Sequence, residues 1–232
     1  GMGRSLNNNS LFIKRDDLFP FFLGGNKARK AILFFEDIKR TNSNCIVTYG
    51  SDNSNHCRVI ANMAAVKKTP CYIISPSETL TKKMSYNATM IKVFATKIIN
   101  CPLASVKETI DDTLQKLKNR GYKPYFIQGG GHGNIGTQAY VDTYQEIIGY
   151  EKDNGINFDY IFHASGTGTT QAGLICGKLL NADNKKIVGI SIARKNPYGG
   201  KIVFDSVNSY LESIGGKKTD MSEVVFVDQY VL

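Results

Sequence analysis

The sequence lacks any long hydrophobic run, and no stretch resembles a signal peptide or a membrane span. It has 20 acidic side chains against 29 basic ones, but the basic residues are scattered and form no basic arm or aromatic-plus-basic ladder. Its five cysteines are odd in number and match no zinc-binding spacing. We therefore expect a cytoplasmic protein in a reducing environment, with no metal site and no membrane or nucleic-acid partner.

The chain has instead a regular alternation of short apolar stretches and longer helical ones. Helices are predicted near 26–40, 55–67, 78–90, 104–120, 136–149 and 170–182. Strands are predicted at 11–14, 45–49, 71–75, 91–95, 125–128, 159–164, 187–193 and 224–227. Apolar strands separated by helices predict an α/β protein with mostly parallel, doubly wound sheets.

A polar segment at 151–158, which contains Gly155, is typical of a linker between two lobes. Residues 43–150 are then expected to form a smaller, four-stranded α/β lobe. Residues 1–42 plus 151–232 are expected to form a larger lobe. Ligands of such sheets bind beyond the carboxyl ends of the strands, where the glycine-, serine- and asparagine-rich loops fall.

The segment KRDDLFPFFLGGNKARK (14–30) places two glycines and a good N-cap, Asn26, directly before Lys27. Lys27 is therefore predicted in the first turn of a helix, where the positive end of the helix dipole lowers the pKa of an amine. A lysine with more free amine is what Schiff-base chemistry needs. The alternative is a solvated lysine at a helix start. We interpret the cluster Lys14–Asp17 as structural, a support for the loop before Gly24.

The segment SGTGTTQAG (165–173) lies between a predicted strand and a predicted helix. Its glycines let backbone N–H groups converge, its threonines add hydroxyl donors, and the helix adds its positive end. No GK[ST] follows, so it is not a Walker loop, and the glycine spacing does not fit G-x-G-x-x-G. We expect a phosphate-binding loop here, with a plain turn as the alternative.

Two further loops follow predicted strands. In YGSDNSNHCR (49–58) a hydroxyl, an amide and an imidazole stand at a helix start, where they bind an anion or simply cap the helix. In QGGGHGNIG (128–136) four glycines surround His132, as in a loop that approaches a ligand closely or in a flexible connection. His163 is interpreted as a partly buried histidine with satisfied hydrogen bonds.

Taken together and in this order, the four segments resemble the family of D-cysteine desulfhydrase and 1-aminocyclopropane-1-carboxylate (ACC) deaminase. These are pyridoxal 5'-phosphate (PLP) enzymes of the tryptophan-synthase-β-like fold. The resemblance implies two lobes, PLP as cofactor, a small amino acid as substrate and a PLP-dependent lyase or deaminase reaction. We also expect a homodimer.

The resemblance also implies a role for each matched residue. Lys27 would carry the cofactor and move protons, and Ser54 would hold the substrate carboxylate and assist proton transfer. Asn55 would bind the phenolate oxygen of PLP and adjoin the substrate. His56 would contact the substrate and is more typical of the desulfhydrase branch, since deaminases usually have glutamine. The cofactor phosphate would be held by Gly166, Thr167, Gly168, Thr169 and Thr170.

The chain departs from the family pattern in three places. His132 stands where the family more often has a small polar residue. Family members usually have a longer segment before KRDD, and a substantial one beyond the position of Asp228, which supplies a tyrosine and a partner for the pyridine nitrogen. We therefore expect a chain truncated at its C-terminus, an open cofactor pocket and slow turnover. The alternatives are a non-catalytic or impaired PLP-binding homologue, a β-replacement enzyme, and a dinucleotide-binding oxidoreductase.

Overall fold

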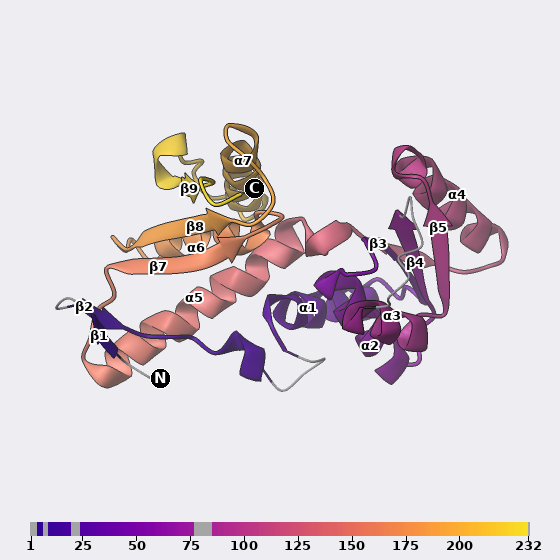
Figure 1. Ribbon diagram of the computed structural model, residues 1–232, viewed down its shortest axis with the longest axis horizontal. Helices are drawn as coiled ribbons and strands as arrows, with labels where there is room; N and C mark the ends of the chain where they lie inside the picture. Colours follow the sequence, from indigo (N-terminus) through magenta and orange to yellow (C-terminus); the bar gives the residue numbers. More distant parts are fainter. Residues whose placement is uncertain (1–3, 7–8, 20–23, 77–84, 232) are drawn as a thin grey trace.

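The computed structural model describes residues 4–6, 9–19, 24–76 and 85–231. It shows an α/β protein with a four-stranded and a three-stranded sheet, both fully parallel (Figure 1). Two short strands near the N-terminus, β1 (Arg4–Leu6) and β2 (Asn9–Leu11), pair with each other in antiparallel fashion. The prediction of an α/β fold with mostly parallel sheets is confirmed.

The four-stranded sheet has the order β5-β4-β3-β6. Alternate residues of β3 face opposite sides, so Ile46 packs with the helices of one face while Cys45 and Val47 pack with the other. Helices therefore cover both faces, as a doubly wound sheet requires. The strands are β3 (Cys45–Tyr49), β4 (Cys71–Pro76), β5 (Lys97–Cys101) and β6 (Pro124–Ile127); α1 (Asn26–Arg40), α2 (Asn55–Val66) and α3 (Tyr86–Phe94) lie on one face and α4 (Val106–Asn119) on the other.

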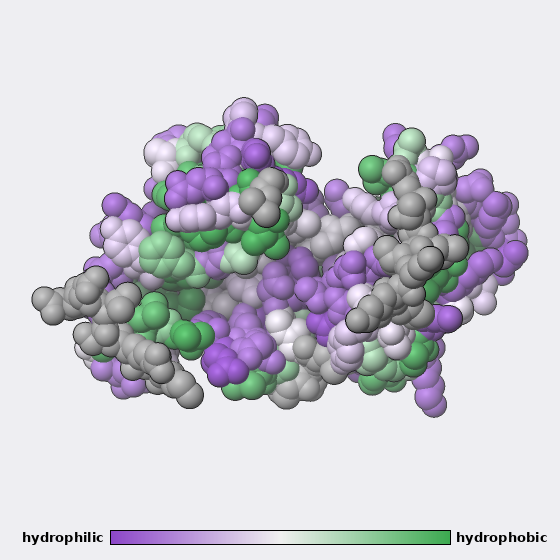
Figure 2. All heavy atoms as spheres, viewed as in Figure 1, coloured by the Kyte–Doolittle hydropathy of each residue, from purple (hydrophilic) through white to green (hydrophobic). Residues whose placement is uncertain are grey.

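The three-stranded sheet has the order β7-β8-β9. Its helical layer buries a second core, while Tyr160 and Phe162 of β7 and Ile192 after β8 stay 50%, 63% and 67% exposed. Figure 2 shows hydrophobic side chains gathered on the visible surface over β7 and β8. The strands are β7 (Tyr160–Ser165), β8 (Lys186–Ser191) and β9 (Val225–Val227); the helices are α5 (Asn134–Asn154), α6 (Thr169–Leu180) and α7 (Tyr198–Ser213).

Two helices run between the sheets. The buried face of α1 belongs to the core of the four-stranded sheet, while its Leu33 packs against the core of the three-stranded one. Helix α5 packs along α6 and also contacts α1 and α7 (Figure 1). The predicted linker at 151–158 is wrong in its first half, because Glu151 is buried and α5 continues to a left-handed cap at Gly155. The division into two lobes at residues 42 and 151 stays a prediction.

Two predicted strands are wrong. Residues 91–95 lie at the end of α3, which Ser85 caps by accepting a hydrogen bond from the Ala88 N–H, and the next strand is β5. Of the predicted strand at 11–14, only Leu11 is paired, in β2. Helix α7 lies where no helix is predicted. Residues 78–84 of the predicted helix at 78–90 lie outside the described residues.

The five cysteines are all free and buried, so each packs as a small hydrophobic side chain. Cys45, Cys57, Cys71 and Cys101 belong to the two cores beside the four-stranded sheet, and Cys176 belongs to the core of α5, α6 and α7. Among the helices that the structure describes, none is both long and apolar enough to cross a membrane.

Glycines let α5 and α6 approach closely. A Cβ atom on Gly173 of α6 would lie 2.3 Å from the Thr137 carbonyl oxygen of α5, and one on Gly177 would lie 2.4 Å from Cβ of Tyr144. Neither gap accepts a methyl group, since backbone atoms and a buried ring cannot move aside. The spacing of these two helices therefore depends on glycine at both positions.

We predict that Gly173→Ala lowers the free energy of unfolding by about 1–3 kcal/mol, because the added methyl group forces α5 and α6 apart. Gly149→Ala on α5 is the matched control: nothing lies within 4 Å of its Cβ position, so alanine should raise stability by about 0.5–1 kcal/mol. Urea denaturation of both variants measures the difference. Equal effects of the two substitutions would contradict the close-packing argument.

Candidate active site

The glycine pair before α1 is held by the cluster Lys14–Asp17. The Gly25 N–H donates to the Asp16 carbonyl at 2.8 Å, and a Cβ atom on Gly24 would lie only 2.4 Å from the Asp17 carbonyl oxygen. The Asp16 carboxylate accepts hydrogen bonds from Arg29 at 3.0 Å and from the Tyr140 hydroxyl at 2.8 Å. The cluster therefore fixes the turn that starts α1, which agrees with the structural role expected for it.

The N-cap of α1 lies one residue earlier than predicted. Gly25 is the N-cap, with φ of 83°, and Asn26 is the first helical residue. The Asn26 amide instead donates to the Thr170 hydroxyl at 3.2 Å and joins α1 to α6. Lys27 lies in the first turn, as predicted.

The Lys27 amine points toward a glycine loop. Its Nζ donates to the Gly130 carbonyl oxygen at 2.8 Å, and the side chain is only partly exposed. Burial lowers the pKa of Lys27 to about 8. Near neutral pH a much larger fraction of this amine is unprotonated than in an ordinary lysine, and the unprotonated amine is the form that attacks a carbonyl carbon.

Lys30, one turn further along α1, is almost completely buried at 1% exposure. Its Nζ donates to the Thr169 hydroxyl at 2.5 Å, and none of the ion pairs among the described residues involves it. Burial lowers the pKa of Lys30 well below its ordinary value, and the nearby charge of Lys27 lowers it further. A buried amine without an acidic partner is costly, so its position is best explained by an anionic ligand that it faces.

Sequence reasoning missed Lys30. The signal was present, because residues three apart share one face of a helix and Lys30 follows Lys27 at that spacing. A second lysine on the same face as a reactive one, in a helix start that also faces a threonine-rich loop, is the pattern that would have identified it.

The predicted phosphate loop connects β7 to α6. Gly168 is the N-cap of α6, with φ of 96°, in the left-handed region that favours glycine. Thr169 and Thr170 are the first two helical residues, so their N–H groups lie at the positive end of a 12-residue helix. The Gly166 carbonyl accepts a hydrogen bond from Arg194 at 2.9 Å. Backbone donors, hydroxyls and cations thus surround this loop, an arrangement suited to an anion.

The glycine loop after β6 lies against both of these features. It contains η3 (Gly129–Gly131), with φ of 72° at Gly130 and 68° at Gly131. A Cβ atom on Gly130 would lie 2.4 Å from Cγ2 of Thr167, and one on Gly131 would lie 3.3 Å from Cδ of Lys30. The loop is a packed part of the site, which favours the ligand-contact interpretation over a flexible connection.

The N-terminus of α2 carries the SNH segment. Ser54 is the N-cap and accepts a hydrogen bond from the Cys57 N–H at 3.2 Å, so its own O–H proton can be donated to a ligand. The Asn55 side-chain oxygen, Oδ1, accepts hydrogen bonds from the Arg58 guanidinium at 3.3 Å and from the Asn87 side-chain amide at 3.0 Å. This leaves the Asn55 amide N–H₂ as the group suited to an oxygen acceptor.

The His56 imidazole points into the core. The Thr48 hydroxyl gives its single proton to the Ile127 carbonyl at 2.7 Å, so it must accept from His56 Nε2, 2.9 Å away. The other nitrogen, Nδ1, then carries the lone pair and lies toward Gly131, 3.6 Å from its Cβ position. Burial, with the charges of Lys27 and Lys30, lowers the pKa of His56 to about 3. The neutral ring supports the glycine loop, and a direct contact with substrate stays a prediction.

His163 differs from its expected state. Its Nδ1 lies 3.1 Å from the Ala164 carbonyl oxygen, but its Nε2 is buried and has no hydrogen-bond partner in the described structure. The expectation of a satisfied histidine is therefore wrong for one of its two nitrogens, because the strand places Nε2 where no donor or acceptor lies within reach.

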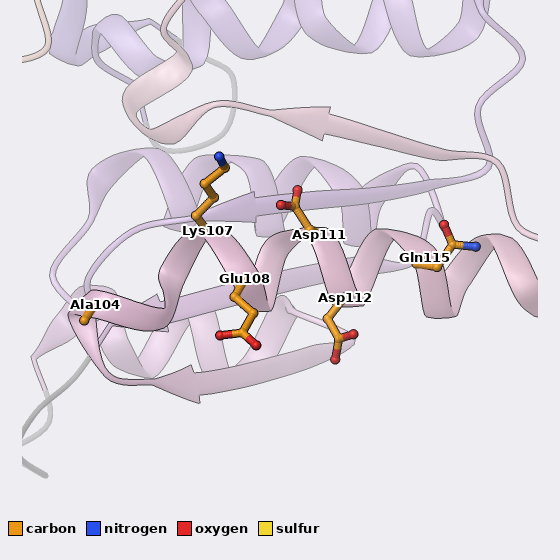
Figure 3. A pocket seen from close by; sticks show the side chains of 6 residues that line it. All are labelled: Ala104, Lys107, Glu108, Asp111, Asp112 and Gln115. Atoms are coloured by element: carbon orange, nitrogen blue, oxygen red, sulfur yellow. The ribbon is translucent and has the colours of Figure 1, made fainter.

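A separate depression on the surface follows α4 and shares no residue with this region. Figure 3 shows its side chains pointing to different sides of one helix, with no second element closing over them. It is lined by Ala104, Lys107, Glu108, Asp111, Asp112 and Gln115. The convergence of α1, α2 and the two glycine-containing loops therefore remains the candidate active site.

Comparison with known proteins identifies the family. Residues 1–231 match the family model described as "Pyridoxal-phosphate dependent enzyme". The chain belongs to this family. PLP enzymes related to it include the D-cysteine desulfhydrase of Serratia proteamaculans (strain 568), 30% identical over 190 residues, which are 80% of this chain and 58% of that protein. The D-cysteine desulfhydrase of Klebsiella pneumoniae (strain 342) is 30% identical over 189 residues, 79% of this chain and 57% of that one.

Among solved structures, the crystal structure of an ACC deaminase homologue superposes on this PLP-family chain with a TM-score of 0.84 and 26% identity, over 94% of this chain and 66% of that one. This confirms the tryptophan-synthase-β-like fold and PLP as the cofactor of the family. The chain spans about 58% of the length of the curated relatives it matches.

The residues present fit PLP. The Lys27 amine can bond to its aldehyde carbon, while the α6 N-terminus, Thr169 and the buried Lys30 suit its phosphate. The lack of a Cβ atom at Gly130 lets the glycine loop pack closely on Thr167 of the phosphate loop, where a Cβ atom would lie 2.4 Å from Cγ2 of Thr167. When bound, PLP supplies an electron sink for the bond that breaks at the substrate Cα.

The cofactor-free protein should show the cost of burying Lys30. Its pKa is lower in the folded than in the unfolded state, so the unfolded chain binds more protons between these two values and stability rises with pH. From pH 7 to 9, the free energy of unfolding of the wild type should gain up to about 1.4 kcal/mol per pH unit relative to Lys30→Met.

Lys39→Met is the control, since Lys39 lies on the exposed side of the same helix. Denaturant unfolding at several pH values measures both differences. A wild-type curve that runs parallel to that of Lys30→Met would show that Lys30 titrates normally in the folded protein.

Proposed function

We propose that this protein is a PLP-dependent lyase that removes ammonia, with or without sulfide, from a small amino acid. The observation that carries the proposal is the Lys27 amine, with a pKa of about 8, directed at the glycine loop that packs on the phosphate loop. A partly unprotonated amine beside an anion site is the pairing that PLP chemistry requires.

The phosphate loop would hold the cofactor phosphate with its backbone N–H groups and its threonine hydroxyls. The α6 N-terminus and Lys30 provide positive charge, and the Asn26 amide orients the Thr170 hydroxyl. Arg194 fixes the loop backbone through the Gly166 carbonyl. The proposed phosphate ligands are Gly166, Thr167, Gly168, Thr169 and Thr170.

The α2 N-terminus would hold the other side of the ligand. The Asn55 amide N–H₂ is proposed to donate to the phenolate oxygen of PLP, and Ser54 to donate to the substrate carboxylate and assist proton transfer. Both suggestions are supported by the hydrogen bonds above, which occupy the acceptor atoms of these side chains and leave their donors for the ligand. His56 is proposed to act near the substrate, with its ring set against the glycine loop.

D-Cysteine is the substrate that we propose first, with ACC as the alternative. The two relatives above are named as D-cysteine desulfhydrases, and position 56 is histidine. A β-replacement reaction on the same scaffold and a PLP-binding role without catalysis are the remaining possibilities.

We also propose that the protein works in the cytoplasm, as a homodimer and without nucleic acid. Five free, buried thiols support a reducing compartment. The exposed apolar side chains Phe162 and Ile192 over the three-stranded sheet support self-association.

Reduction with borohydride in the presence of PLP should leave a phosphopyridoxyl group on Lys27, because the unprotonated amine forms the reducible bond. Peptide mass spectrometry locates the modified lysine. Lys27→Ala should lose the adduct, and Lys27→Arg should not restore it, because a guanidinium stays protonated. Lys39→Ala, an exposed control on the same helix, should keep it. An adduct on any other lysine would show that Lys27 is not the lysine that bonds to PLP.

Adding D-cysteine to the PLP-loaded protein should release sulfide and ammonia, and Lys27→Ala should abolish the release. Sulfide and ammonia assays with D-cysteine, L-cysteine and ACC measure the choice of substrate. Ammonia from ACC without sulfide from D-cysteine would place the chain with the deaminases. Release from none of them by a protein that binds PLP would favour the non-catalytic alternative.

A further inference from the structure

His132 follows the glycine loop at the point where that loop meets the phosphate loop. The preceding Gly130 packs on Thr167, and the His132 ring is partly buried beside the Thr167 backbone carbonyl. The ring also borders a small cleft between the start of α5 and helix α7. The cleft is lined by His132, Gly133, Asn134, Ile202, Asp205, Ser206 and Ser209.

The charges around the ring are mostly positive. The charges of Lys27 and Lys30 on α1, and of Arg194 in the segment after β8, all act on the ring. The acidic group on the cleft wall is Asp205 of α7, which Lys201 neutralises at 2.7 Å. Burial lowers the pKa of His132; the Thr167 carbonyl opposes this, while Lys30, Arg194 and Lys27 lower it further.

A phosphate dianion in the loop would reverse this balance. Two negative charges beside Lys30 and Arg194 would offset the repulsion that these cations exert on a protonated ring and would attract a proton to it. We propose that His132 takes up a proton from solvent when a phosphate monoester binds at residues 166–170, and so becomes a pH-dependent part of the phosphate site. This rests on the proposed function, since it takes the phosphate of PLP as the ligand.

The sign of the pH dependence follows from the two protonation states. The pKa of His132 is below its ordinary value in the free protein and is raised in the complex, so binding takes up a proton between the two values. The affinity for the phosphate monoester is highest at pH values below the lower pKa of His132, and it falls as the pH rises from the lower pKa to the higher one. Lys27, Lys30 and the phosphate also titrate, so only a comparison of matched variants isolates His132.

The ligand for the test is pyridoxine 5'-phosphate, which has the phosphate but no aldehyde and therefore forms no bond with Lys27. Calorimetry of wild type and His132→Asn at pH 7, in two buffers of different ionisation enthalpy, counts the protons taken up. The wild type should take up more protons per ligand than His132→Asn. At pH 6 the variant should bind about tenfold more weakly, the loss of one charge-assisted hydrogen bond, and at pH 8.5 within about twofold.

Lys39→Met is the control, since Lys39 lies on the exposed side of α1, and it should behave as the wild type. NMR of histidine-labelled wild-type protein needs no substitution: the His132 imidazole should titrate at higher pH with ligand than without. His132→Gln identifies that resonance by its disappearance.

Equal proton uptake by wild type and His132→Asn, with an affinity ratio that does not change with pH, would overturn the inference while leaving the phosphate site in place. Absence of binding to either protein would overturn the phosphate site and the inference together. Formation or loss of the Lys27 adduct with PLP then decides separately whether the proposed cofactor role survives.

Discussion

The buried amine of Lys30 is the constraint around which the site is built. It lies where no acidic side chain of the described structure pairs with it, and its single hydrogen bond goes to Thr169 at the start of α6. Its positive charge lowers the pKa of the neighbouring His56 imidazole, and a negative charge supplied by a ligand would offset the cost of burying it. The same amine thus disfavours the empty site and favours an anionic ligand.

The backbone around that amine is interlocked. A Cβ atom on Gly136, at the start of α5, would lie 1.9 Å from the Gly131 carbonyl oxygen and 3.5 Å from Cδ of Lys30. Further along, α5 lies directly on Gly173 and Gly177 of α6. The helix that begins beside the glycine loop therefore also fixes the helix that begins at the phosphate loop. The two loops that face the ligand cannot shift independently without disturbing this contact.

Much of this arrangement could be predicted from the sequence, where a local signal exists. The glycine-containing loops that follow strands, and the N-cap at Ser54, depend on residues that are neighbours in the sequence. The structure contains these features. The strand predicted at 91–95 was wrong because a short, mostly apolar segment with two β-branched residues is compatible with a strand or a helix, and the Ser85 cap favours the helix. The burial of Lys30 and the inward turn of His56 depend on contacts from distant segments, and a linear pattern does not contain those contacts.

The buried cysteines can report which part of the protein opens. Because every thiol is free and enclosed, a thiol reagent can react only where the surrounding core has loosened. Four of these thiols report on the cores of the four-stranded sheet, whereas Cys176 alone reports on the core of α5, α6 and α7. Timed labelling therefore separates the two halves of the molecule and shows which of them comes apart first.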